Sequence, residues 1–436
     1  MSPAPRATMT ELVIPGGMGP VTGRLRVPGD KSISHRAVLL AALAEGRSEL
    51  RRLSSGLDVG RTLAAIAACG ALIESSTGET FTVTGGRSVL REPAAVIDVG
   101  NSGTAIRLLA GWSAAFPWLT VLQGDASIAE RPMGRVAAPL RAMGARIDGR
   151  DDGRLAPLII RGGGLSGIDY RLPVASAQVK AAVLLAGLAA DGATTVREDV
   201  PTRAHTEEML AACGADLEVG PGWVTVRRSV LSPFNLAIPA DPSQAAFWVV
   251  AACVIPDSDL VVEDLYVGQA RAGFIDVLRR MGADLSYEHR DERRQTADLR
   301  VRYRPLAATT VGGSEVPGLI DEIPVLAVAA ARAEGVTTFA DAAELRVKES
   351  DRVTSVVAAL RAVGVNAEPR PDGLVVQGNG GAPLAGGKID SWGDHRVAMA
   401  FAIAGLDAAG PTVVAGWESV ATSYPGFEED LRRCVS

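Results

Sequence analysis

Lysine, cysteine, histidine and aromatic residues are all scarce in this chain of 436 residues. The four cysteines are scattered without a Cys-x-x-Cys pair, which argues against a disulfide framework and against a structural zinc site. Aromatic residues make up 4% of the chain and no basic run is interleaved with them, and the formal net charge is −6, so nucleic-acid binding is disfavoured. No apolar run approaches the length of a membrane span, and residues 1–19 lack the pattern of a secretory signal peptide. We therefore expect a cytoplasmic protein with reduced thiols.

The composition is that of an ordinary globular protein, with 47% hydrophobic and 22% charged residues. The length suggests two or three domains. Among the basic residues the usage is uneven, because 40 of the 44 are arginine. The four lysines are Lys31, Lys180, Lys348 and Lys388. A compact, freely rotating ammonium differs from a planar guanidinium, so a lysine kept in such a chain is a candidate functional residue.

A segment of about seventy residues recurs six times along the chain. Each copy has an extended run, a polar turn, a helix rich in Ala, Leu and Val, and a second extended run. The helix starts are marked, 67 to 78 residues apart, by Ser32, Ser102, Ser176, Ser243, Asp321 and Asp394. An amphipathic helix ending in glycine follows in five copies, and glycine there favours the left-handed backbone that closes a helix. These glycines are Gly70, Gly144, Gly214, Gly282 and Gly364.

The repeat predicts an α/β protein of six β-α-β-α-β-β units, three in each of two domains. The sixth unit stops after its second helix, near 425–434, and lacks its last two strands. Because Glu11–Ile14 and Val21–Val27 are spare strand-like runs, we expect the N-terminal segment to complete that unit. The predicted domains are then 28–236 and 1–27 plus 237–436, with a cleft between them as the ligand site. The alternative is a single elongated solenoid.

The turns before the apolar helices carry the candidate chemistry. Helix N-termini present unpaired N–H groups and a positive dipole end, which suit phosphates and carboxylates. Taken alone, each turn has an ordinary structural interpretation as a cap or a solvated charge cluster. Their recurrence at one place in successive units favours a binding site for anions. The segments are 28–36 (PGDKSISHR), 100–107 (GNSGTAIR), 125–133 (DASIAERPM), 344–352 (ELRVKESDR) and 392–396 (WGDHR).

Over residues 10–430 these motifs resemble the 5-enolpyruvylshikimate-3-phosphate synthase family of enolpyruvyl transferases. The matching segments are GDKSISHR, GNSGTAIR, ERPMG, SAQVK, RAHTE, LRVKESDR, WGDHRVAM and ATSYP. The resemblance implies two domains with buried helices and outer sheets, an inside-out α/β barrel. It also implies transfer of the enolpyruvyl group from phosphoenolpyruvate to the 5-hydroxyl of shikimate 3-phosphate, without metal or organic cofactor. No nucleic-acid or membrane partner is implied, and we expect a monomer.

The resemblance assigns a role to each matching residue. Asp321 would accept the proton of the 5-hydroxyl, and either Glu349 or Lys31 would protonate the methylene carbon of phosphoenolpyruvate. Shikimate 3-phosphate would be bound by Lys31, Ser32, Arg36, Ser176, Ala177 (through its backbone), Gln178, Arg203, Asp321 and Lys348. Phosphoenolpyruvate would be bound by Lys31, Gly103, Arg131, Gln178, Arg352 and Arg396. Thr422 stands where many members carry a lysine that binds the phosphate of phosphoenolpyruvate.

Two other functions fit the motifs less well. The sister enolpyruvyl transferase that acts on UDP-N-acetylglucosamine typically carries a cysteine five residues before the loop arginine, where this chain has Ala126 before Arg131. That family also has Lys-Asn where this chain has Lys31-Ser32. A non-catalytic anion-binding protein on the same scaffold would have no need of both Asp321 and Glu349.

Overall fold

The computed structural model describes residues 10–76 and 78–435, and these divide into two compact units. The unit called N-terminal below is Gly29–Pro239. The C-terminal unit combines the described residues up to Pro28 with those from Ala240 onward. Residues 1–9 of the predicted C-terminal domain lie outside the described residues.

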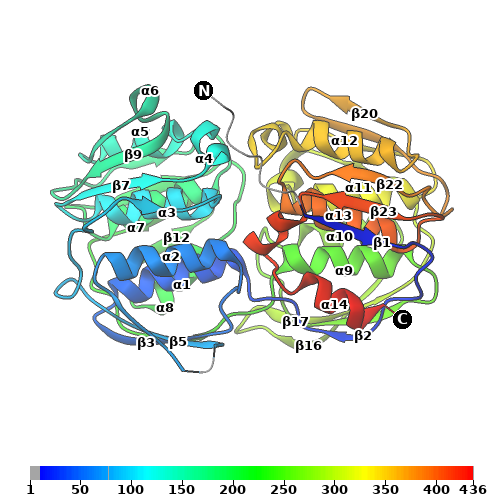
Figure 1. The fold of residues 1–436 in the computed structure, drawn as a ribbon. Helices are drawn as coiled ribbons and strands as arrows, with labels where there is room; N and C mark the ends of the chain where they lie inside the picture. The colour runs from blue at the N-terminus through cyan, green and yellow to red at the C-terminus, as the bar shows by residue number, and fades with distance from the viewer. Residues whose placement is uncertain (1–9, 77, 436) are drawn as a thin grey trace. The chain divides into compact units, whose positions relative to one another are not determined.

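The N-terminal unit contains three copies of the β-α-β-α-β-β repeat (Figure 1). In chain order its elements are α1 (Lys31–Leu43), β3 (Gly46–Arg51), α2 (Leu57–Ala68), β4 (Leu72–Ser75), β5 (Thr80–Gly85), β6 (Ile97–Asp98), α3 (Gly103–Ala114), β7 (Leu119–Gln123), α4 (Ala126–Glu130), α5 (Gly134–Ala142), β8 (Arg146–Gly149), α6 (Arg150–Gly153), β9 (Leu155–Arg161), β10 (Asp169–Arg171), α7 (Ala177–Gly187), β11 (Thr194–Arg197), α8 (His205–Ala212), β12 (Leu217–Gly220), β13 (Trp223–Val226) and β14 (Asn235–Ala237).

The C-terminal unit repeats the same order and draws two strands from the start of the chain. Its elements are β1 (Glu11–Ile14), β2 (Thr22–Leu25), α9 (Pro242–Val254), β15 (Asp259–Tyr266), α10 (Gly273–Arg280), β16 (Asp284–Asp291), β17 (Thr296–Arg302), β18 (Thr310–Val311), η1 (Gly313–Gly318), α11 (Ile323–Arg332), β19 (Val336–Phe339), η2 (Ala343–Val347), α12 (Arg352–Ala362), β20 (Ala367–Arg370), β21 (Gly373–Gln377), β22 (Gly387–Asp390), α13 (His395–Leu406), β23 (Thr412–Ala415), η3 (Trp417–Thr422) and α14 (Phe427–Cys434).

Each complete copy forms one four-stranded sheet with a fixed pairing pattern. In the sheet β6-β7-β9-β8, β6 and β7 are parallel, and β9 pairs antiparallel with both β7 and β8. The sheets β10-β11-β13-β12 and β18-β19-β21-β20 follow the same pattern. A parallel pair needs a crossover, which the apolar first helix of each copy supplies. The predicted fold class is confirmed.

The first strands of two copies are exchanged along the chain. β2 precedes α1 but lies parallel to β15, in the sheet of the copy that contains α9. Conversely, β14 precedes α9 but lies parallel to β3, in the sheet of the copy that contains α1. The prediction that Val21–Val27 completes the sixth unit is therefore wrong. Only β1 joins that unit, antiparallel to β23, and its sheet has three strands among the described residues.

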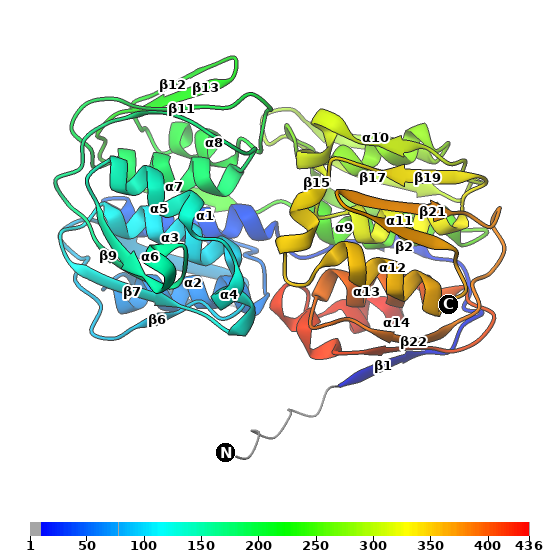
Figure 2. The ribbon, with the colours of Figure 1, turned by 90° about the horizontal axis from the view of Figure 1, so that it is seen from above.

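The first helices form the core of each unit, and the sheets lie outside them (Figures 1 and 2). Every residue of α9, α11 and α13 is buried, and α1, α3 and α7 are buried over nearly their whole length. A helix that is apolar on all sides can be stable only when neighbours surround it. Most polar residues of α1, α3, α7, α9 and α13 lie in the first two turns of these helices, and several of the candidate site residues are among them.

The second helices are amphipathic and end as the sequence predicts. The five predicted glycines all have left-handed backbones, with φ between 78° and 105°. In each case the residue after the glycine donates its N–H to a carbonyl five residues earlier, at 3.0 or 3.1 Å. This pattern satisfies helix carbonyls that would otherwise have no partner.

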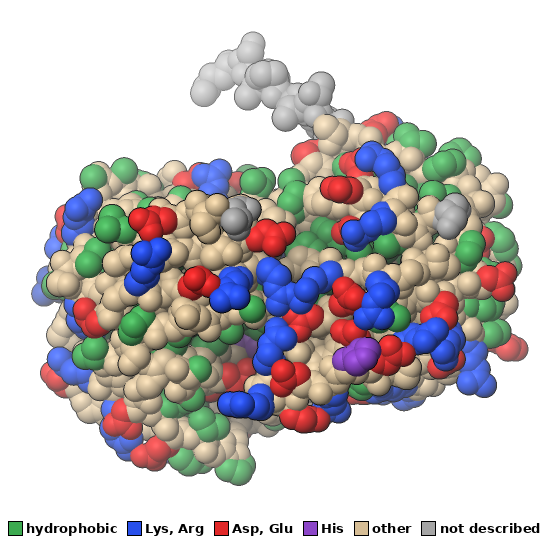
Figure 3. Space-filling view, turned by 90° about the horizontal axis from the view of Figure 1, so that it is seen from below, with side chains coloured by type: hydrophobic (Ala, Val, Ile, Leu, Met, Phe, Trp, Pro, Cys, Tyr) green, Lys and Arg blue, Asp and Glu red, His purple; other side chains and the backbone are tan. Residues whose placement is uncertain are grey.

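Basic and acidic side chains alternate on the face of the molecule drawn in Figure 3, with hydrophobic side chains scattered among them. Many of the charged groups form surface pairs, such as Arg24 with Glu263 and Asp298. In the described part of the chain, no helix combines the length and the apolar character that a membrane crossing requires.

Candidate active site

Side chains at the helix starts cap the buried helices. Asp30, Ser102, Ser176, Asp241 and Asp394 each accept a hydrogen bond from a first-turn N–H, at 2.8 to 3.3 Å. Thus Ser102, Ser176 and Asp394 are caps as marked. The other three marks are displaced, because Ser32 and Ser243 lie two residues after the caps of their helices and Asp321 lies one residue before Glu322, which precedes α11.

The caps change where an anion can bind. At α1, α9 and α13 a carboxylate already accepts the N–H groups of the first turn. The positive end of each of these helices is therefore partly neutralised. Anion binding beside them must rely on the basic side chains of the same turns. Only α3 and α7 start with neutral serine caps.

The N-terminal unit carries a group of basic residues, Lys31, Arg36, Arg107, Arg131 and Arg203, which we call the basic set. The ammonium of Lys31 lies 2.8 Å from a carboxylate oxygen of Asp58, which belongs to the first turn of α2. Both side chains are largely buried, so the ion pair holds the lysine in one place. Ser32 follows it and is half-buried.

Arg36 links the starts of α1 and α7. It is buried, its Nη1 donates to the Ser32 carbonyl at 2.9 Å, and its Nη2 reaches the Ala177 carbonyl at 3.5 Å. Its Nε donates to the Thr206 hydroxyl at 2.7 Å. Arg36 thus lies one turn after Ser32 on α1 and also contacts the backbone carbonyl of that residue. Ser176, the cap of α7, precedes Ala177 in the same turn.

Gln178 links α7 to α3. Its amide Nε2 donates to the Thr104 hydroxyl at 2.9 Å, and its Oε1 accepts from Arg107 Nη1 at 2.6 Å. Gly103 lies beside this pair, and a methyl group added at Gly103 would come 2.4 Å from Nη1 of Arg131. Gly103, Gln178, Arg107 and Arg131 therefore form one packed cluster at the start of α3.

Arg203 lies in the segment between β11 and α8 and is half-buried. The flanks of that segment are fixed by Lys180, whose ammonium lies 3.0 Å from Glu198 and 2.6 Å from Glu207. Thr202 also donates its hydroxyl to Glu198, at 2.7 Å.

The C-terminal unit brings Asp321, Lys348, Glu349, Arg352 and Arg396 together, and we call these five residues the carboxylate set. One oxygen of Asp321 accepts from the Lys348 ammonium at 3.1 Å and from Arg352 Nη1 at 3.2 Å. Arg352 Nη2 also donates to Glu349. Arg396 Nη1 donates to the Asp321 backbone carbonyl at 3.2 Å.

In the segment 344–352, helical spacing would place Lys348, Glu349 and Arg352 on one side of a helix. The side chains do come together, but not on a helix. The structure starts α12 only at Arg352, and places Lys348 and Glu349 in the turn between η2 and that helix. The three side chains converge because Asp321 and Arg352 hold them, and helical spacing plays no part.

Burial and charge shift the pKa values of the two central cations in opposite directions. Burial lowers the pKa of Lys348, the neighbouring Arg352 lowers it further, and Asp321 partly offsets both effects. For Arg352, burial also disfavours the charge, but Asp394, Glu349 and Asp321 together more than compensate, so its pKa is raised. Arg352 is consequently a permanent cation at the centre of three carboxylates, whereas Lys348 can lose its proton more readily than an ordinary lysine.

A second layer of buried charge lies behind the carboxylate set. Glu322, next to Asp321, accepts from the Ser243 hydroxyl and lies 3.8 Å from Arg396 and 3.6 Å from Arg271. Arg271 also binds Asp241, the cap of α9, at 2.5 Å. These contacts fix the starts of α9, α11 and α13 relative to one another.

Thr422 lies at the end of η3, next to the first turn of α13. Its hydroxyl lies 3.3 Å from His395 Nδ1 and donates to the Ser419 carbonyl at 2.7 Å. The threonine therefore sits beside the residue that precedes Arg396, and it supplies a hydroxyl where the resemblance would place a lysine.

Several residues of these clusters were not found by sequence reasoning. Asp58 and Arg271 carried no signal, because each is a single charged residue in an unremarkable context. Glu322 follows Asp321 in the same turn, but no role was assigned to it. Lys180 was a candidate as one of four lysines and lies within the SAQVK motif, but no role was assigned to it either.

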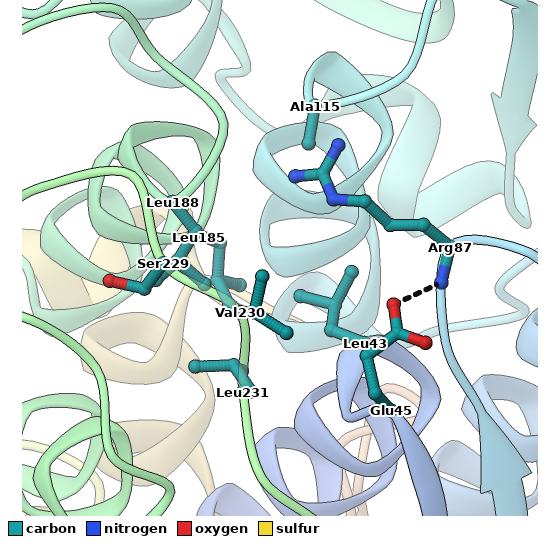
Figure 4. A pocket seen from close by; sticks show the side chains of 9 residues that line it. All are labelled: Leu43, Glu45, Arg87, Ala115, Leu185, Leu188, Ser229, Val230 and Leu231. Carbon is teal, nitrogen blue, oxygen red and sulfur yellow. Dashed lines mark hydrogen bonds between the residues drawn. The ribbon is translucent and has the colours of Figure 1, made fainter.

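A pocket in the N-terminal unit lies away from these residues (Figure 4). It is lined at the C-terminal ends of α1, α3 and α7 by Leu43, Ala115 and Leu185, together with the segment 229–231. Its free volume of about 10 Å³ is no more than a single water molecule needs. Among the described residues, no group of three or more His, Cys, Asp or Glu side chains is placed to hold a metal ion.

The two sets offer complementary chemistry. The basic set can bind anionic groups through arginine and lysine, with geometry fixed by second contacts on each side chain. The carboxylate set provides two carboxylates, each partly exposed (17% for Asp321 and 15% for Glu349) and each bound to the same buried arginine. Such a pair can hold and move protons at two different points of a ligand.

Comparison with known proteins assigns the family. The model of the EPSP synthase (3-phosphoshikimate 1-carboxyvinyltransferase) family matches residues 15–431. A 3-phosphoshikimate 1-carboxyvinyltransferase of Pelotomaculum thermopropionicum is 50% identical over 417 residues, which are 95% of this chain and 96% of that protein. Another of that name from Gloeobacter violaceus is 50% identical over 418 residues, covering 95% of this chain and 96% of that protein.

Solved structures show the same relationship. The EPSP synthase of Acinetobacter baumannii superposes with a TM-score of 0.86 at 41% identity, covering 98% of this chain and all of the other. The enolpyruvyl transferase NikO of Streptomyces tendae shares the fold, with a TM-score of 0.76 at 19% identity and 97% of each chain covered. From the extent of the family match and the identity to these relatives, we conclude that the chain belongs to the EPSP synthase (3-phosphoshikimate 1-carboxyvinyltransferase) family.

Proposed function

We propose that this protein transfers the enolpyruvyl group of phosphoenolpyruvate to the 5-hydroxyl of shikimate 3-phosphate and releases phosphate, a step of aromatic amino acid biosynthesis. Family membership over almost the whole chain supports the proposal. The observation that carries it is the carboxylate set, in which Asp321 and Glu349 are both bound to the buried Arg352. An addition–elimination that moves protons at two atoms needs two such groups.

The binding roles divide between the two sets. Lys31, Ser32, Arg36, Ser176, the backbone of Ala177, Gln178 and Arg203 would bind shikimate 3-phosphate, together with Lys348 and Asp321. Lys31, Gly103, Arg131 and Gln178 would bind phosphoenolpyruvate, together with Arg352 and Arg396. The reaction requires that both sets reach the same pair of substrates. Arginine and lysine offset the repulsion between two phosphorylated acids and fix their orientation.

The chemical steps follow from the positions of the two carboxyl groups. Glu349 or Lys31 protonates the methylene carbon of phosphoenolpyruvate, which leaves the adjacent carbon cationic. The 5-hydroxyl oxygen attacks that carbon while Asp321 accepts its proton, and a tetrahedral intermediate forms. The carbon–oxygen bond to phosphate then breaks, and loss of a methyl proton regenerates the double bond. Each proton transfer by a positioned side chain contributes typically about 10²–10⁴-fold.

Transfer to UDP-N-acetylglucosamine is less well supported. The family model and the named relatives described above are EPSP synthases. In addition, Ala126 occupies the position where the sister family typically has cysteine. A mixture of UDP-N-acetylglucosamine and phosphoenolpyruvate should therefore release no phosphate above background.

The proposal is tested with Asp321→Asn. We expect phosphate release from shikimate 3-phosphate plus phosphoenolpyruvate to fall by about 10²-fold or more, on general-base magnitudes. Binding of shikimate 3-phosphate, measured by titration calorimetry, should persist because the amide keeps the size of the carboxylate.

The matched control is Asp341→Asn, the same change at an exposed aspartate of the same unit whose left-handed backbone (φ 55°) suits asparagine. It should turn over like the wild type. Undiminished turnover in Asp321→Asn would remove that residue from the base role, and a wild-type protein without phosphate release would refute the function itself.

A further inference from the structure

One buried lysine lies outside every role assigned above. Lys180 belongs to α7, one turn after the cap Ser176, and its side chain is 1% exposed. A buried ammonium is costly unless it is paired and hydrogen-bonded. Lys180 meets that requirement through Glu198 and Glu207, at 3.0 and 2.6 Å. In a chain that uses arginine ten times as often as lysine, this position has kept the compact cation.

The two carboxylates flank a single segment. Glu198 directly follows β11, and Glu207 lies in the first turn of α8, so the two carboxylates stand at the two ends of the segment that joins these elements. Through these two ion pairs, one ammonium binds both ends of the 198–207 segment to α7. An ammonium has three donors on one atom, and a planar guanidinium could not reach both carboxylates with the same geometry.

Further contacts carry this restraint to Arg203. Glu198 accepts from the backbone N–H of Thr202 at 3.2 Å and from its hydroxyl at 2.7 Å. Thr206, on the other side of Arg203, accepts from Arg36 Nε at 2.7 Å. Arg36 has additional contacts to Ser32 and Ala177. The backbone before Arg203 is held through the bonds of Thr202 to Glu198, and the backbone after it leads into α8.

We propose that Lys180 is a positioning residue for shikimate 3-phosphate, which acts by holding the 198–207 segment and thereby fixing Arg203. This inference rests on the proposed function. It assigns no contact between Lys180 and substrate, because the ammonium is enclosed by its two carboxylates. It predicts a defect in one substrate only, since the residues assigned to phosphoenolpyruvate and not also to shikimate 3-phosphate have no described contact with Lys180, Glu198 or Glu207; these residues are Gly103, Arg131, Arg352 and Arg396.

The test compares Lys180→Met with Arg203→Ala and with the double variant. In Lys180→Met we expect the KM for shikimate 3-phosphate to rise by about tenfold or more, the magnitude of a displaced charge-assisted contact. The KM for phosphoenolpyruvate and the kcat should stay within about twofold of the wild type, because the groups that act in the chemical steps do not move. The surface control is Lys388→Met, whose lysine is 70% exposed and pairs only with Glu11 among the described residues; it should change neither KM.

The double variant separates positioning from a general loss of structure. If Lys180 acts through Arg203, Lys180→Met should add less than about twofold to the KM for shikimate 3-phosphate once Arg203 is alanine. Full additivity of the two effects, or an unchanged KM in Lys180→Met, would overturn the proposal. Turnover by the wild type in the same assay distinguishes this failure from failure of the proposed function.

A milder variant decides the matter if Lys180→Met does not fold. Thr202→Val keeps the ion pairs and the side-chain shape but removes the hydroxyl donor to Glu198. It should raise the KM for shikimate 3-phosphate by about two- to fivefold with unchanged kcat, on the magnitude of one hydrogen bond. A wild-type KM in folded Thr202→Val would count against the proposal.

Discussion

At the scale of single residues, Gly103 shows how closely the candidate site is packed. A methyl group at this position would come 2.4 Å from Arg131 Nη1 and 3.3 Å from Arg107 Nη1. Both neighbours are the ends of flexible side chains, so the chain can still fold, but Arg131 must move. The absence of a side chain at Gly103 is thus a condition for the position of that guanidinium.

We therefore expect Gly103→Ala to raise the KM for phosphoenolpyruvate by about tenfold or more, because a displacement near 1 Å can cost about 10²-fold. Thermal unfolding should change little. Steady-state kinetics with each substrate varied in turn provide the measurement. Gly60→Ala is the matched control, since nothing lies within 4 Å of the added methyl group there. Equal KM values for the two variants would show that Arg131 does not depend on Gly103.

His35 makes a prediction about pH. Burial lowers the pKa of His35 well below 6.5, and the charges of Lys31 and Arg36 lower it further. The native protein therefore keeps this imidazole neutral, while the unfolded chain binds a proton near pH 6.5. As the pH falls below 6.5 the unfolded state takes up a proton that the native state does not, so the free energy of unfolding must fall.

In His35→Gln the free energy of unfolding should change less with pH than in the wild type. The difference in slope should reach up to about 1.4 kcal/mol per pH unit between the native pKa of His35 and pH 6.5. Glutamine can still form a hydrogen bond with Thr62, which lies 2.7 Å from His35 Nδ1. Urea denaturation at pH 7, 6 and 5 measures the slopes. Parallel slopes for the variant and the wild type would show that His35 is not the group responsible.

The residues that sequence reasoning could identify were those in motifs. Lys348, Glu349 and Arg352 lie within nine residues of one another, and Asp321 stands out in an apolar segment. The ion-pair partners of the motif residues could not be predicted, because these contacts join residues that are far apart in the sequence. Asp394 lies 42 residues from Arg352, and Asp58 lies 27 residues from Lys31. The roles assigned to these residues stay predictions, which the substitutions proposed above test.

At the scale of elements, helix ends were the most predictable feature. A glycine after an amphipathic run specifies a left-handed residue by local sterics alone, and all five such glycines adopt it. Helix starts were less predictable by one or two residues. Asp30 and Asp241 accept the first-turn N–H groups, and the serines that follow them lie inside the helices.

A substitution at Gly144 measures the free-energy cost of a left-handed backbone for a residue with a side chain, without a steric clash. Its φ is 105°, and an added methyl group would meet only a carbonyl oxygen of Gly164, at 3.8 Å. Gly144→Ala should therefore lower the free energy of unfolding by about 1 kcal/mol through backbone strain alone. Gly144→Asn should cost less, because asparagine tolerates the left-handed region. Equal urea midpoints for Gly144→Ala and the wild type would contradict this reasoning.

At the scale of the whole molecule, the repeat predicted the fold class, but the repeat could not show which sheet each terminal strand joins. β2 and β14 have nearly equivalent sequence contexts, since each is followed by a Pro, a small residue and the Asp that caps the next helix. Local pattern does not distinguish a strand that pairs with its own copy from one that pairs elsewhere. Register and partner are set by the completed sheet.

Because β14 pairs with β3 and β2 pairs with β15, we predict that residues 29–239 form an independent folding unit. This segment contains every described strand of its three sheets, including β14. We expect the isolated fragment to unfold cooperatively in urea. The fragment 29–230 lacks β14 and leaves β3 as an exposed edge, so it should unfold at a lower urea concentration. Identical midpoints for the two fragments would show that β14 contributes nothing to the sheet.

The chain passes between its two units twice, at Pro28–Gly29 and at Pro239–Ala240. Beside these crossings Asp30 donates its N–H to the Pro239 carbonyl at 2.8 Å, and Asp241 donates to the Pro28 carbonyl at 3.0 Å. A protease that cuts one crossing therefore cannot release either unit, because the polypeptide still runs through the other. A cut at Pro28–Gly29 would leave the N-terminal piece held without a covalent link, by its pairing with β15 and β23 and by further contacts such as the Gly17 N–H to the Ala408 carbonyl at 2.9 Å. Limited digestion would then give shorter fragments on a denaturing gel, while the size of the protein under native conditions is still unchanged.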